Sequence, residues 1–469
     1  MTRHADRRAG EIRRALDHPI IDGDGHVLEY LPTLWELMAE EGGPAVADRF
    51  RTPTPARWYG LSPDQRRSRR EVRPGFWNWP SENVVDFATA CFPALLEERR
   101  QELGIDFSFV YPSFGIQVPH VADEASRIPG CRAVNRYMAE LFGPYEATIC
   151  PVGVVPMHTP AEALDGLEHG TRLGLRAFVF PGNVRREADG GAWWIDTYGL
   201  DSDFDYDPVW QRCQELGVVV AFHSGSTAWT SRRSISNYVY NHIGHFANAN
   251  DTTAKSLLLG GVTARFPDLR FVFLEGGVAW ACSLLGAVVE HWEKRNGGAV
   301  WAYDPSRFDR ARFGELLDRY GPDRLRRRRA ELADACAGWW LAEESPDGVD
   351  DFGRVEVSRP GDFIRRFVEP FAFGCEADDV LAAWAFQERY VPLGRRLSAV
   401  FSSDIGHWDV PDATGVVPEA YEMVTDGLLT AEQFRAFTFG NIARHYTAMD
   451  PDFFAKTVIG QAVADDRRA

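Results

Sequence analysis

The chain has few of the features that mark secreted or membrane proteins. Its seven cysteines are dispersed with no CxxC pair, and no window reaches the apolar length of a membrane span. The first residues carry several arginines but no apolar segment of the kind that a secretory signal needs. We therefore expect neither a disulfide framework, a thiolate metal cage nor membrane insertion, but a soluble protein of the reducing cytoplasm.

Positive charge is also scarce, because 51 lysines and arginines face 68 aspartates and glutamates, for a net charge of −17. Such a balance repels a phosphate backbone and argues against nucleic acid as a partner. The one local basic run, Arg326 to Arg329, is flanked by Asp323 and Glu331, which favours a solvated helix face over a binding patch. A small-molecule substrate is the expected partner.

Short apolar runs, by contrast, repeatedly alternate with amphipathic helical stretches. Continuous apolar runs suit strands that are buried on both faces, and their alternation with helices is typical of βα units around a parallel sheet. The count reaches eight, which predicts an α/β fold of the TIM (β/α)₈ barrel class. The runs are Ile20 to Val27, Ile105 to Tyr111, Thr148 to Val155, Leu175 to Phe180, Val218 to Phe222, Leu269 to Leu274, Phe363 to Phe373 and Leu397 to Phe401.

Segments that do not follow this alternation of strands and helices define the expected organisation of the chain. We expect an N-terminal arm over 1–19, a barrel over 20–450 and a C-terminal tail over 451–469. Helical or irregular insertions are expected at about 40–92, 182–208 and 295–360, where charged or aromatic residues replace the alternation. The first two follow strand ends and could therefore cover the mouth of the barrel.

Polar residues stand where the core of a barrel should be apolar. Strand alternation places Asp22, Asp24 and His26 on one face of the first run, and a divalent cation would offset the cost of burying them. Turn residues beside Gly23 and Gly25 are the alternative explanation.

Two later runs also end in polar side chains. His223 directly follows the fifth run, and Asp404 follows the eighth. Catalytic groups of barrels lie at the C-terminal ends of strands, so both residues favour a ligand role, although aspartate is also a common turn former. Imidazole and carboxylate donors suit zinc, with manganese or iron as possible alternatives.

With these residues in place, the chain resembles the amidohydrolase-related family of the amidohydrolase superfamily, of the aminocarboxymuconate-semialdehyde decarboxylase type. Each motif is weak alone, but their order along most of the chain is specific. The motifs are Ile21 to Glu29, Glu97 to Ser113 (EERRQELGIDFSFVYPS), Asn135 to Pro160 with PVGVVPMHTP at its end, His242 to Ala249 (HIGHFANA), Gly261 to Trp280 (GVTARFPDLRFVFLEGGVAW), Ser403 to His407 (SDIGH) and Phe439 to Tyr446 (FGNIARHY).

The resemblance implies a distorted TIM barrel with one divalent metal, held by Asp24, His26, His223 and Asp404. It also implies non-oxidative decarboxylation, or hydrolysis of C–N or C–C bonds, of small carboxylated or aromatic-derived substrates, and it suggests a homodimer. Asp24 stands where many relatives have histidine, although acid-x-His variants occur among the aromatic acid decarboxylases of the group.

A second departure from the family pattern concerns proton transfer. The sixth run ends in Glu275, where the decarboxylases usually present a histidine. Glu275 is a candidate general acid or base, a further metal ligand or a structural acceptor. His245, three residues from His242 in an expected helix, is the second candidate for the proton role. His407 is a candidate to orient Asp404 or to reach substrate.

A substrate carboxylate needs a cationic partner, and Arg73, Arg185 or Arg186 could supply it. The aromatic residues Phe76, Trp77 and Trp79 suggest either an apolar lid or the core of an insertion.

Three functions remain open from the sequence. A decarboxylase is favoured, in which Glu275 or, as the second candidate, His245 handles the proton; in a hydrolase, Asp404 or Glu275 would accept the proton of the metal-bound water. A hydrolase with metal-activated water is the rival enzyme. A barrel that binds or scaffolds without catalysis is the alternative of another class.

Overall fold

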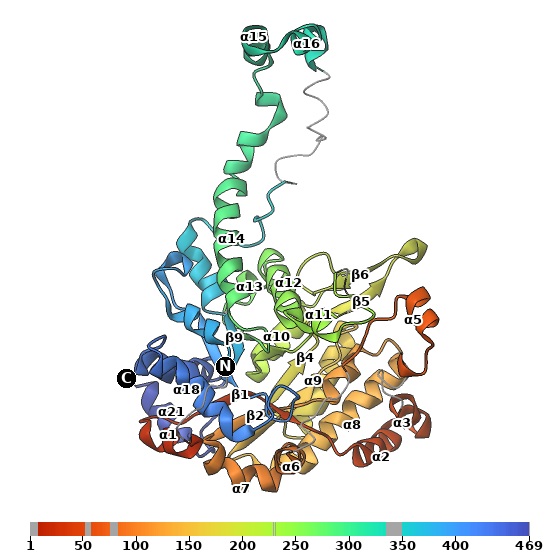
Figure 1. Ribbon diagram of the computed structural model, residues 1–469, viewed down its shortest axis with the longest axis vertical. Coiled ribbons are helices and arrows are strands. Elements are labelled where there is room, and N and C mark those ends of the chain that lie inside the picture. Colours follow the sequence, from red (N-terminus) through yellow and green to blue (C-terminus); the bar gives the residue numbers. More distant parts are fainter. Residues whose placement is uncertain are drawn as a thin grey trace.

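Eight parallel strands form the centre of the fold in the computed structural model, which describes residues 8–51, 58–75, 83–227, 229, 231–333 and 349–468 (Figure 1). The strands follow the order β1-β2-β3-β4-β7-β8-β9-β10, so each pairs with the next one along the sheet. Their bounds are β1 Ile21–Val27, β2 Phe107–Pro112, β3 Ile149–Val154, β4 Ala177–Phe180, β7 Val220–Phe222, β8 Phe271–Phe273, β9 Phe371–Glu376 and β10 Ser398–Ser402.

Helices on the outside of the sheet bury the strands. Every residue of β2, β3, β4, β7 and β8 is buried, which explains why these strands are continuous apolar runs. The α-helices of the barrel body before β9 are α1 Ala9–Ala15, α2 Leu31–Gly42, α3 Pro44–Phe50, α5 Pro63–Arg69, α6 Val84–Cys91, α7 Pro93–Leu103, α8 Glu124–Phe142, α9 Pro160–Arg172, α10 Asp207–Leu216, α11 Tyr238–His242, α12 His245–Leu259, α13 Val262–Arg265 and α14 Ala279–Arg295, and α15 and α16 follow in the arm described below. After β10 come α18 Val416–Thr425, α19 Ala431–Arg435, α20 Asn441–Met449 and α21 Gly460–Asp466.

The first and last strands approach each other and nearly close the barrel. The backbone N–H of Asp404 donates to the carbonyl of Asp24 at 3.0 Å, just beyond the end of β10. Gly23 permits this approach, because a Cβ there would lie 2.6 Å from Cγ1 of Val400 and 2.9 Å from Cδ1 of Ile442. A residue with a side chain would push β1 and β10 apart.

The prediction of a (β/α)₈ barrel is confirmed, and each of the eight apolar runs contains or overlaps a strand of the sheet. The seventh run is the one whose extent was wrong. Its first half, Ile364–Val368, is a π-helix, and the strand begins only at Phe371. Pro370 explains the break, since proline disfavours helical conformation in the residue before it.

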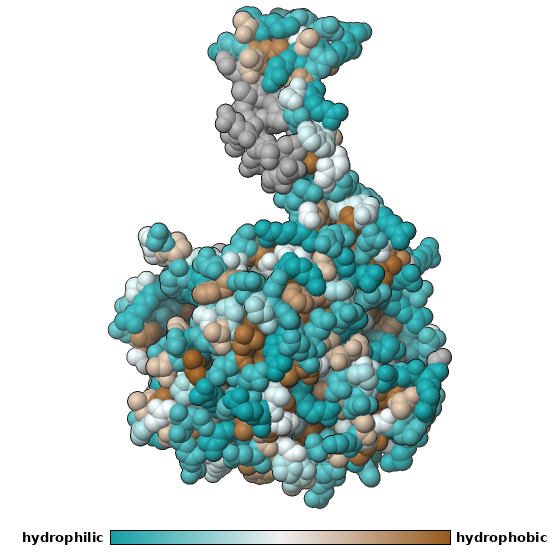
Figure 2. Space-filling model, turned by 180° about the vertical axis from the view of Figure 1, so that it is seen from behind, coloured by the Kyte–Doolittle hydropathy of each residue, from teal (hydrophilic) through white to brown (hydrophobic). Residues whose placement is uncertain are grey.

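Two features stand out from the barrel. A two-stranded antiparallel hairpin of β5 (Val184–Glu187) and β6 (Trp193–Asp196) follows β4. A long arm that continues from α14 carries α15 (Arg310–Tyr320) and α16 (Asp323–Arg326) far from the body, with a largely hydrophilic surface (Figures 1 and 2). Within the described ranges, no helix combines the length and apolarity that crossing a membrane requires.

Candidate metal centre

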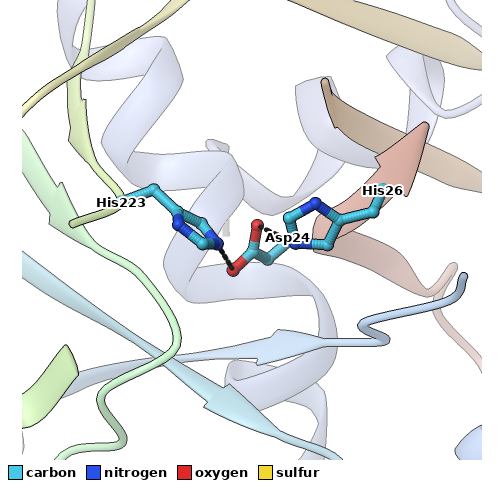
Figure 3. A group of neighbouring side chains, drawn as sticks. All are labelled: Asp24, His26 and His223. Atoms are coloured by element: carbon cyan, nitrogen blue, oxygen red, sulfur yellow. Dashed lines mark ion pairs between the residues drawn. The ribbon is translucent and has the colours of Figure 1, made fainter. Parts of the chain in front are cut away.

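The ends of β1 and β7 bring three predicted ligands together. The carboxylate of Asp24 lies between the rings of His26 and His223 (Figure 3). Oδ1 of Asp24 is 3.6 Å from Nε2 of His26, and Oδ2 is 3.9 Å from Nε2 of His223. All three residues are buried, with at most 4% of their surface exposed. One ligand atom from each lies within 4.8 Å of the other two, as binding a single ion requires.

Asp404 joins this group from the segment that follows β10. Its Oδ1 is 3.3 Å from Nε2 of His26, and it is only 2% exposed. The ring of His407 stacks on that of His26 at 3.8 Å, and its Nδ1 lies 2.7 Å from Oδ1 of Asp404. Nε2 of His407 is 3.1 Å from the hydroxyl of Ser113 at the end of β2. The structure thus places His407 directly against a predicted ligand.

Glu275, which follows β8, lies in the same cluster of predicted ligands. Its Oε2 is 2.8 Å from Nε2 of His223, and its side chain is 6% exposed. Despite this short distance, neither atom has a partner with hydrogen-bond geometry. Close polar atoms without hydrogen bonds are expected where several ligands point at a common cation.

Other atoms of the cluster also lack hydrogen-bond partners. Oδ1 of Asp24, Nε2 of His26 and both carboxylate oxygens of Asp404 are buried without a hydrogen-bond partner. Unpaired buried polar groups are costly and rare in native proteins. Ligand atoms around one divalent cation lie about 3 to 4 Å apart when bonds are about 2.1 Å long, which matches the observed distances. The residues therefore fit a divalent cation with nitrogen and oxygen ligands.

The backbone is strained at both acids that follow β8 and β10. Glu275 has φ +56° and Asp404 has φ +49°, which are left-handed values that residues with a Cβ rarely adopt. Such strain costs of order 1 kcal/mol or more and concentrates at functional sites. It turns each carboxylate toward the cluster at a point where the strand has ended.

Burial dominates the electrostatics. It raises the pKa of Asp24, Glu275 and Asp404 well above the usual range, although the His223 ring partly opposes the shift at Asp24. Burial also lowers the pKa of His26 and His223. Without a cation the carboxylates thus tend to hold protons while the imidazoles are neutral, and neutral imidazole is the form that binds metals.

Asp22 does not join the ligand atoms, contrary to the expectation from strand alternation. A bulge between Asp22 and Gly25 shifts the register of β1 against β2. The Asp22 carboxylate instead accepts hydrogen bonds from the backbone N–H groups of Asp24 and Ser403 and from the Ser403 hydroxyl. Asp22 therefore holds the backbone next to the ligand cluster in place without contributing a ligand atom.

His242 and His245 do not share one helix, so that prediction was wrong. Gly244 adopts φ +68° and separates α11, which ends at His242, from α12, which begins at His245. The two rings are nevertheless 4.7 Å apart. Nδ1 of His245 lies 3.2 Å from the Thr227 hydroxyl, and its buried Nε2 has no hydrogen-bond partner. His245 lies beside the centre, and the ring of Phe246 packs against both His245 and His223.

The predicted arginines are occupied elsewhere. Arg185 is 59% exposed on the hairpin, where it pairs with Glu187 and stacks on Trp193. Arg186 pairs with Asp196 in the same hairpin. The guanidinium of Arg73 stacks on Trp58 at 5.0 Å. Phe76, Trp77 and Trp79 lie outside the described residues.

Sequence reasoning missed Glu376, the last residue of β9. Its carboxylate clusters with those of Glu275 and Asp404, with one oxygen of each within 4.8 Å of the others. The signal was present in the sequence, since Glu376 ends an apolar run just as Glu275 and Asp404 follow theirs. It was lost because the seventh strand was placed too early.

A family model described as Amidohydrolase matches residues 89–325, just over half of the chain. The chain belongs to the amidohydrolase family. The matched range contains His223 and Glu275. Asp24, His26 and Asp404 lie outside this range in the sequence, but in the structure they lie close to His223 and Glu275. This confirms the resemblance that the motifs indicated.

Individual amidohydrolase relatives are distant. The chain is 27% identical over 208 residues to 2-keto-4-carboxy-3-hexenedioate hydratase of Sphingobium sp. strain SYK-6, which is 44% of this chain and about half, 55%, of that protein. An amidohydrolase from Mycobacterium avium subsp. paratuberculosis K-10 has the same fold, with a TM-score of 0.54 and 16% identity over 92% of this chain and 100% of that chain. A 5-carboxyvanillate decarboxylase from Novosphingobium aromaticivorans, complexed with manganese, gives a TM-score of 0.48 and 12% identity over 95% of this chain and 100% of that chain.

Proposed function

We propose that this amidohydrolase is a metal-dependent carbon–carbon lyase that removes CO₂ from a small carboxylated, unsaturated or aromatic substrate. The observation that carries the proposal is the convergence of buried, unpartnered ligand atoms from Asp24, His26, His223 and Asp404 at the C-terminal ends of the strands. This is the end of a barrel at which active sites lie.

One divalent cation fits these residues, with zinc, manganese and iron as candidates. When bound, it would supply an electrophile that binds the oxygens of the substrate and offsets negative charge that develops during the reaction. The nitrogen ligands suit zinc or iron, and the excess of carboxylates suits manganese.

We assign Glu275 to the ligand shell, which is one of the roles that the sequence left open for it. A general acid is expected to donate a hydrogen bond to a neighbour, and a structural acceptor is expected to receive one. Oε2 of Glu275 does neither, although Nε2 of His223 is only 2.8 Å away. Its strained backbone, followed by Gly276 and Gly277, directs the carboxylate at the point where the other ligands meet.

With Glu275 assigned as a ligand, we assign proton transfer to the pair of Asp404 and His407. Burial raises the pKa of Asp404 and lowers that of His407 to about 3, so the proton of the pair resides on Asp404 in the cation-free protein. Once Asp404 acts as a ligand it must give up that proton, and an acceptor, Nδ1 of His407, lies 2.7 Å away. In each turnover the His407 imidazole, oriented by a carboxylate, can take a proton from solvent and deliver it to the carbon that loses CO₂. His245 is the alternative donor, since its Nε2 is free of partners.

Water addition is a second candidate, because the curated relative is named a hydratase of a carboxylated, unsaturated keto acid. The same ligand set and the same proton carrier would serve addition of water to a carbon–carbon double bond, or hydrolysis. Decarboxylation releases CO₂, whereas hydration and hydrolysis both place an oxygen atom of water in the product.

The test compares purified wild-type protein with His223→Ala. Both are loaded with Zn²⁺ or Mn²⁺ and incubated with hydroxybenzoates, unsaturated dicarboxylates and the relative's substrate. We expect CO₂ release by the wild type, and a loss of both metal and activity in the variant. Incorporation of ¹⁸O from labelled water without CO₂ would replace decarboxylation by hydration or hydrolysis. Absence of stoichiometric metal from the wild type would refute both.

A further inference from the structure

The arm that continues from α14 presents large apolar side chains to solvent at its tip. Phe313, Leu316 and Tyr320 of α15 are 40%, 38% and 66% exposed, and their spacing of three and four residues places them on one face of the helix. Because α15 lies far from the barrel (Figure 1), the described body of the same chain does not bury this face, and apolar surface is visible at the tip in Figure 2. Exposed apolar side chains that lie together mark interaction surfaces.

Unpaired arginines accompany the apolar face of the tip. Residues 304–331 contain nine arginines and six acids, although the whole chain has a net charge of −17. Four of these arginines form ion pairs within the arm. Arg310, Arg324 and Arg327 are exposed and form no ion pair with any residue that the structure describes. The tip therefore favours a partner surface that is both apolar and acidic.

A surface of that kind lies at the base of the same arm, on the 3₁₀ helix η10 (Val380–Phe386). This helix packs against α14, from which the arm continues. Its exposed apolar residues are Val380, Leu381 and Trp384, at 40%, 38% and 51%. The base thus carries an apolar patch of its own.

Acidic side chains accompany the patch on η10. Asp378 and Asp379 directly precede the helix, and residues 376–388 contain four acids without a lysine or arginine. The pKa of Glu419 in α18 is raised by burial and then by the charge of Asp378, which shows that a further acid lies near. The two ends of the arm therefore combine apolar patches with charges of opposite sign.

We propose that two copies of this chain form a two-fold symmetric dimer through their arms, with the tip of each arm docked on η10 of the other copy. Arms that lie side by side in opposite directions bring each tip to the base of the other arm. The apolar face of α15 then covers Trp384, and the unpaired arginines meet Asp378. Two-fold symmetry forms this contact twice. Trp301 and Tyr303, which are 44% and 57% exposed between α14 and α15, face the second arm near the symmetry axis.

A second copy of the chain is the partner that these patches favour. Every chain carries both halves of the contact, so a dimer covers all four patches at once. A phosphate backbone could pair with the arginines of the tip, but it would leave the apolar patches exposed. The acidic remainder of the chain would also repel it.

Sedimentation velocity of the full-length protein over a range of concentrations tests this arrangement. Leu316→Glu places a charge in the apolar face of the tip, and Trp384→Glu places one in the patch on η10. Val458→Glu, at an apolar residue that is 54% exposed outside both patches, is the matched control. All three side chains are exposed, so the variants should fold, which circular dichroism checks.

We expect a dimer for the wild type and for Val458→Glu, and a dimer weakened about tenfold or more for Leu316→Glu and for Trp384→Glu. An equimolar mixture of the two weakened variants should dimerise better than either alone, because one of its two contacts joins an intact tip to an intact base. Recovery in the mixture distinguishes tip-to-base docking from contact between two tips.

A monomeric wild type would overturn the proposal, as would a dimer that neither variant weakens or a mixture that recovers nothing. A wild-type monomer that sediments with added RNA would assign the tip to nucleic acid instead. The metal centre lies outside the proposed contact, so none of these outcomes alters the proposed function, which CO₂ release tests separately.

Discussion

Oδ2 of Asp22 accepts a hydrogen bond from the hydroxyl of Ser403 at 2.7 Å, and Oδ1 accepts one from the backbone N–H of the same serine at 2.9 Å. Asp22 lies two residues before Asp24, and Ser403 directly precedes Asp404. The contact therefore joins the two segments that carry these ligands, across 381 positions of sequence. Hydrogen bonds behind metal ligands fix their orientation.

Ser403→Ala should weaken metal binding without unfolding the protein. It removes the 2.7 Å hydrogen bond to Asp22 but keeps the one from the backbone, so Asp404 becomes less well placed. Loss of such a supporting contact typically lowers metal affinity about 10- to 100-fold. Competition with a chromogenic chelator measures the affinity, and Ser398→Ala at the other end of β10 is the control. Equal affinities for the two variants would show that the contact does not orient Asp404.

Metal binding should release protons. Burial raises the pKa of Asp24, Glu275 and Asp404, so in the cation-free protein these carboxylates hold protons that a cation must displace. Affinity for Mn²⁺ should consequently rise with pH. Isothermal titration calorimetry in two buffers of different ionisation enthalpy measures the release. Identical heats in both buffers would contradict the shifts.

Glu29 should make stability fall between about pH 4.5 and pH 7. Burial raises the pKa of its carboxyl from 4.5 to about 7, although the backbone N–H groups of Phe114 and Gly115 donate to it. Over this range the folded state holds a proton that the unfolded state loses, so its stabilising effect is complete below pH 4.5 and disappears as the pH rises to 7. The difference is about 3 kcal/mol.

Urea unfolding of the wild type and of Glu29→Gln at a series of pH values tests this effect. The variant cannot titrate, so its unfolding free energy should depend less steeply on pH, whatever its absolute stability. Parallel curves for the two proteins would show that Glu29 does not contribute.

Two arginines of α8 should differ sharply in their contribution to stability. Arg127 forms a two-point ion pair with Glu162 of α9 at 2.9 and 2.7 Å, with both side chains at least nine-tenths buried. Arg132 pairs with Asp165 of the same helix at 2.8 Å, but both side chains are at least 40% exposed. Breaking a buried pair costs about 3 to 5 kcal/mol, whereas an exposed pair contributes about 0 to 1 kcal/mol.

Denaturation of Arg127→Ala and Arg132→Ala measures the difference. We expect Arg127→Ala to be the less stable variant by at least about 2 kcal/mol. Similar losses for both would mean that Glu162 is rehydrated when its partner is removed.

The barrel itself was predictable from the sequence, because a strand buried on both faces must be a continuous apolar run and the helices between strands carry local end signals. Thr159 caps α9, and Gly217 at φ +68° ends α10, as their residue types predict. His26, His223 and Asp404 could be proposed as ligands from the sequence alone, because they are polar residues within or directly after apolar runs, and active sites of barrels lie at the ends of strands.

Tertiary structure alone decided which polar residues meet. A bulge turned Asp22 away from the ligands, Pro370 moved the seventh strand to Phe371 and so brought Glu376 to the centre, and local partners hold Arg185 and Arg186 in their hairpin. Each outcome depends on one residue of register or on one contact between distant segments. Hydrophobic periodicity specifies which face of a strand is buried, but it does not specify where a carboxylate of one strand lies relative to another.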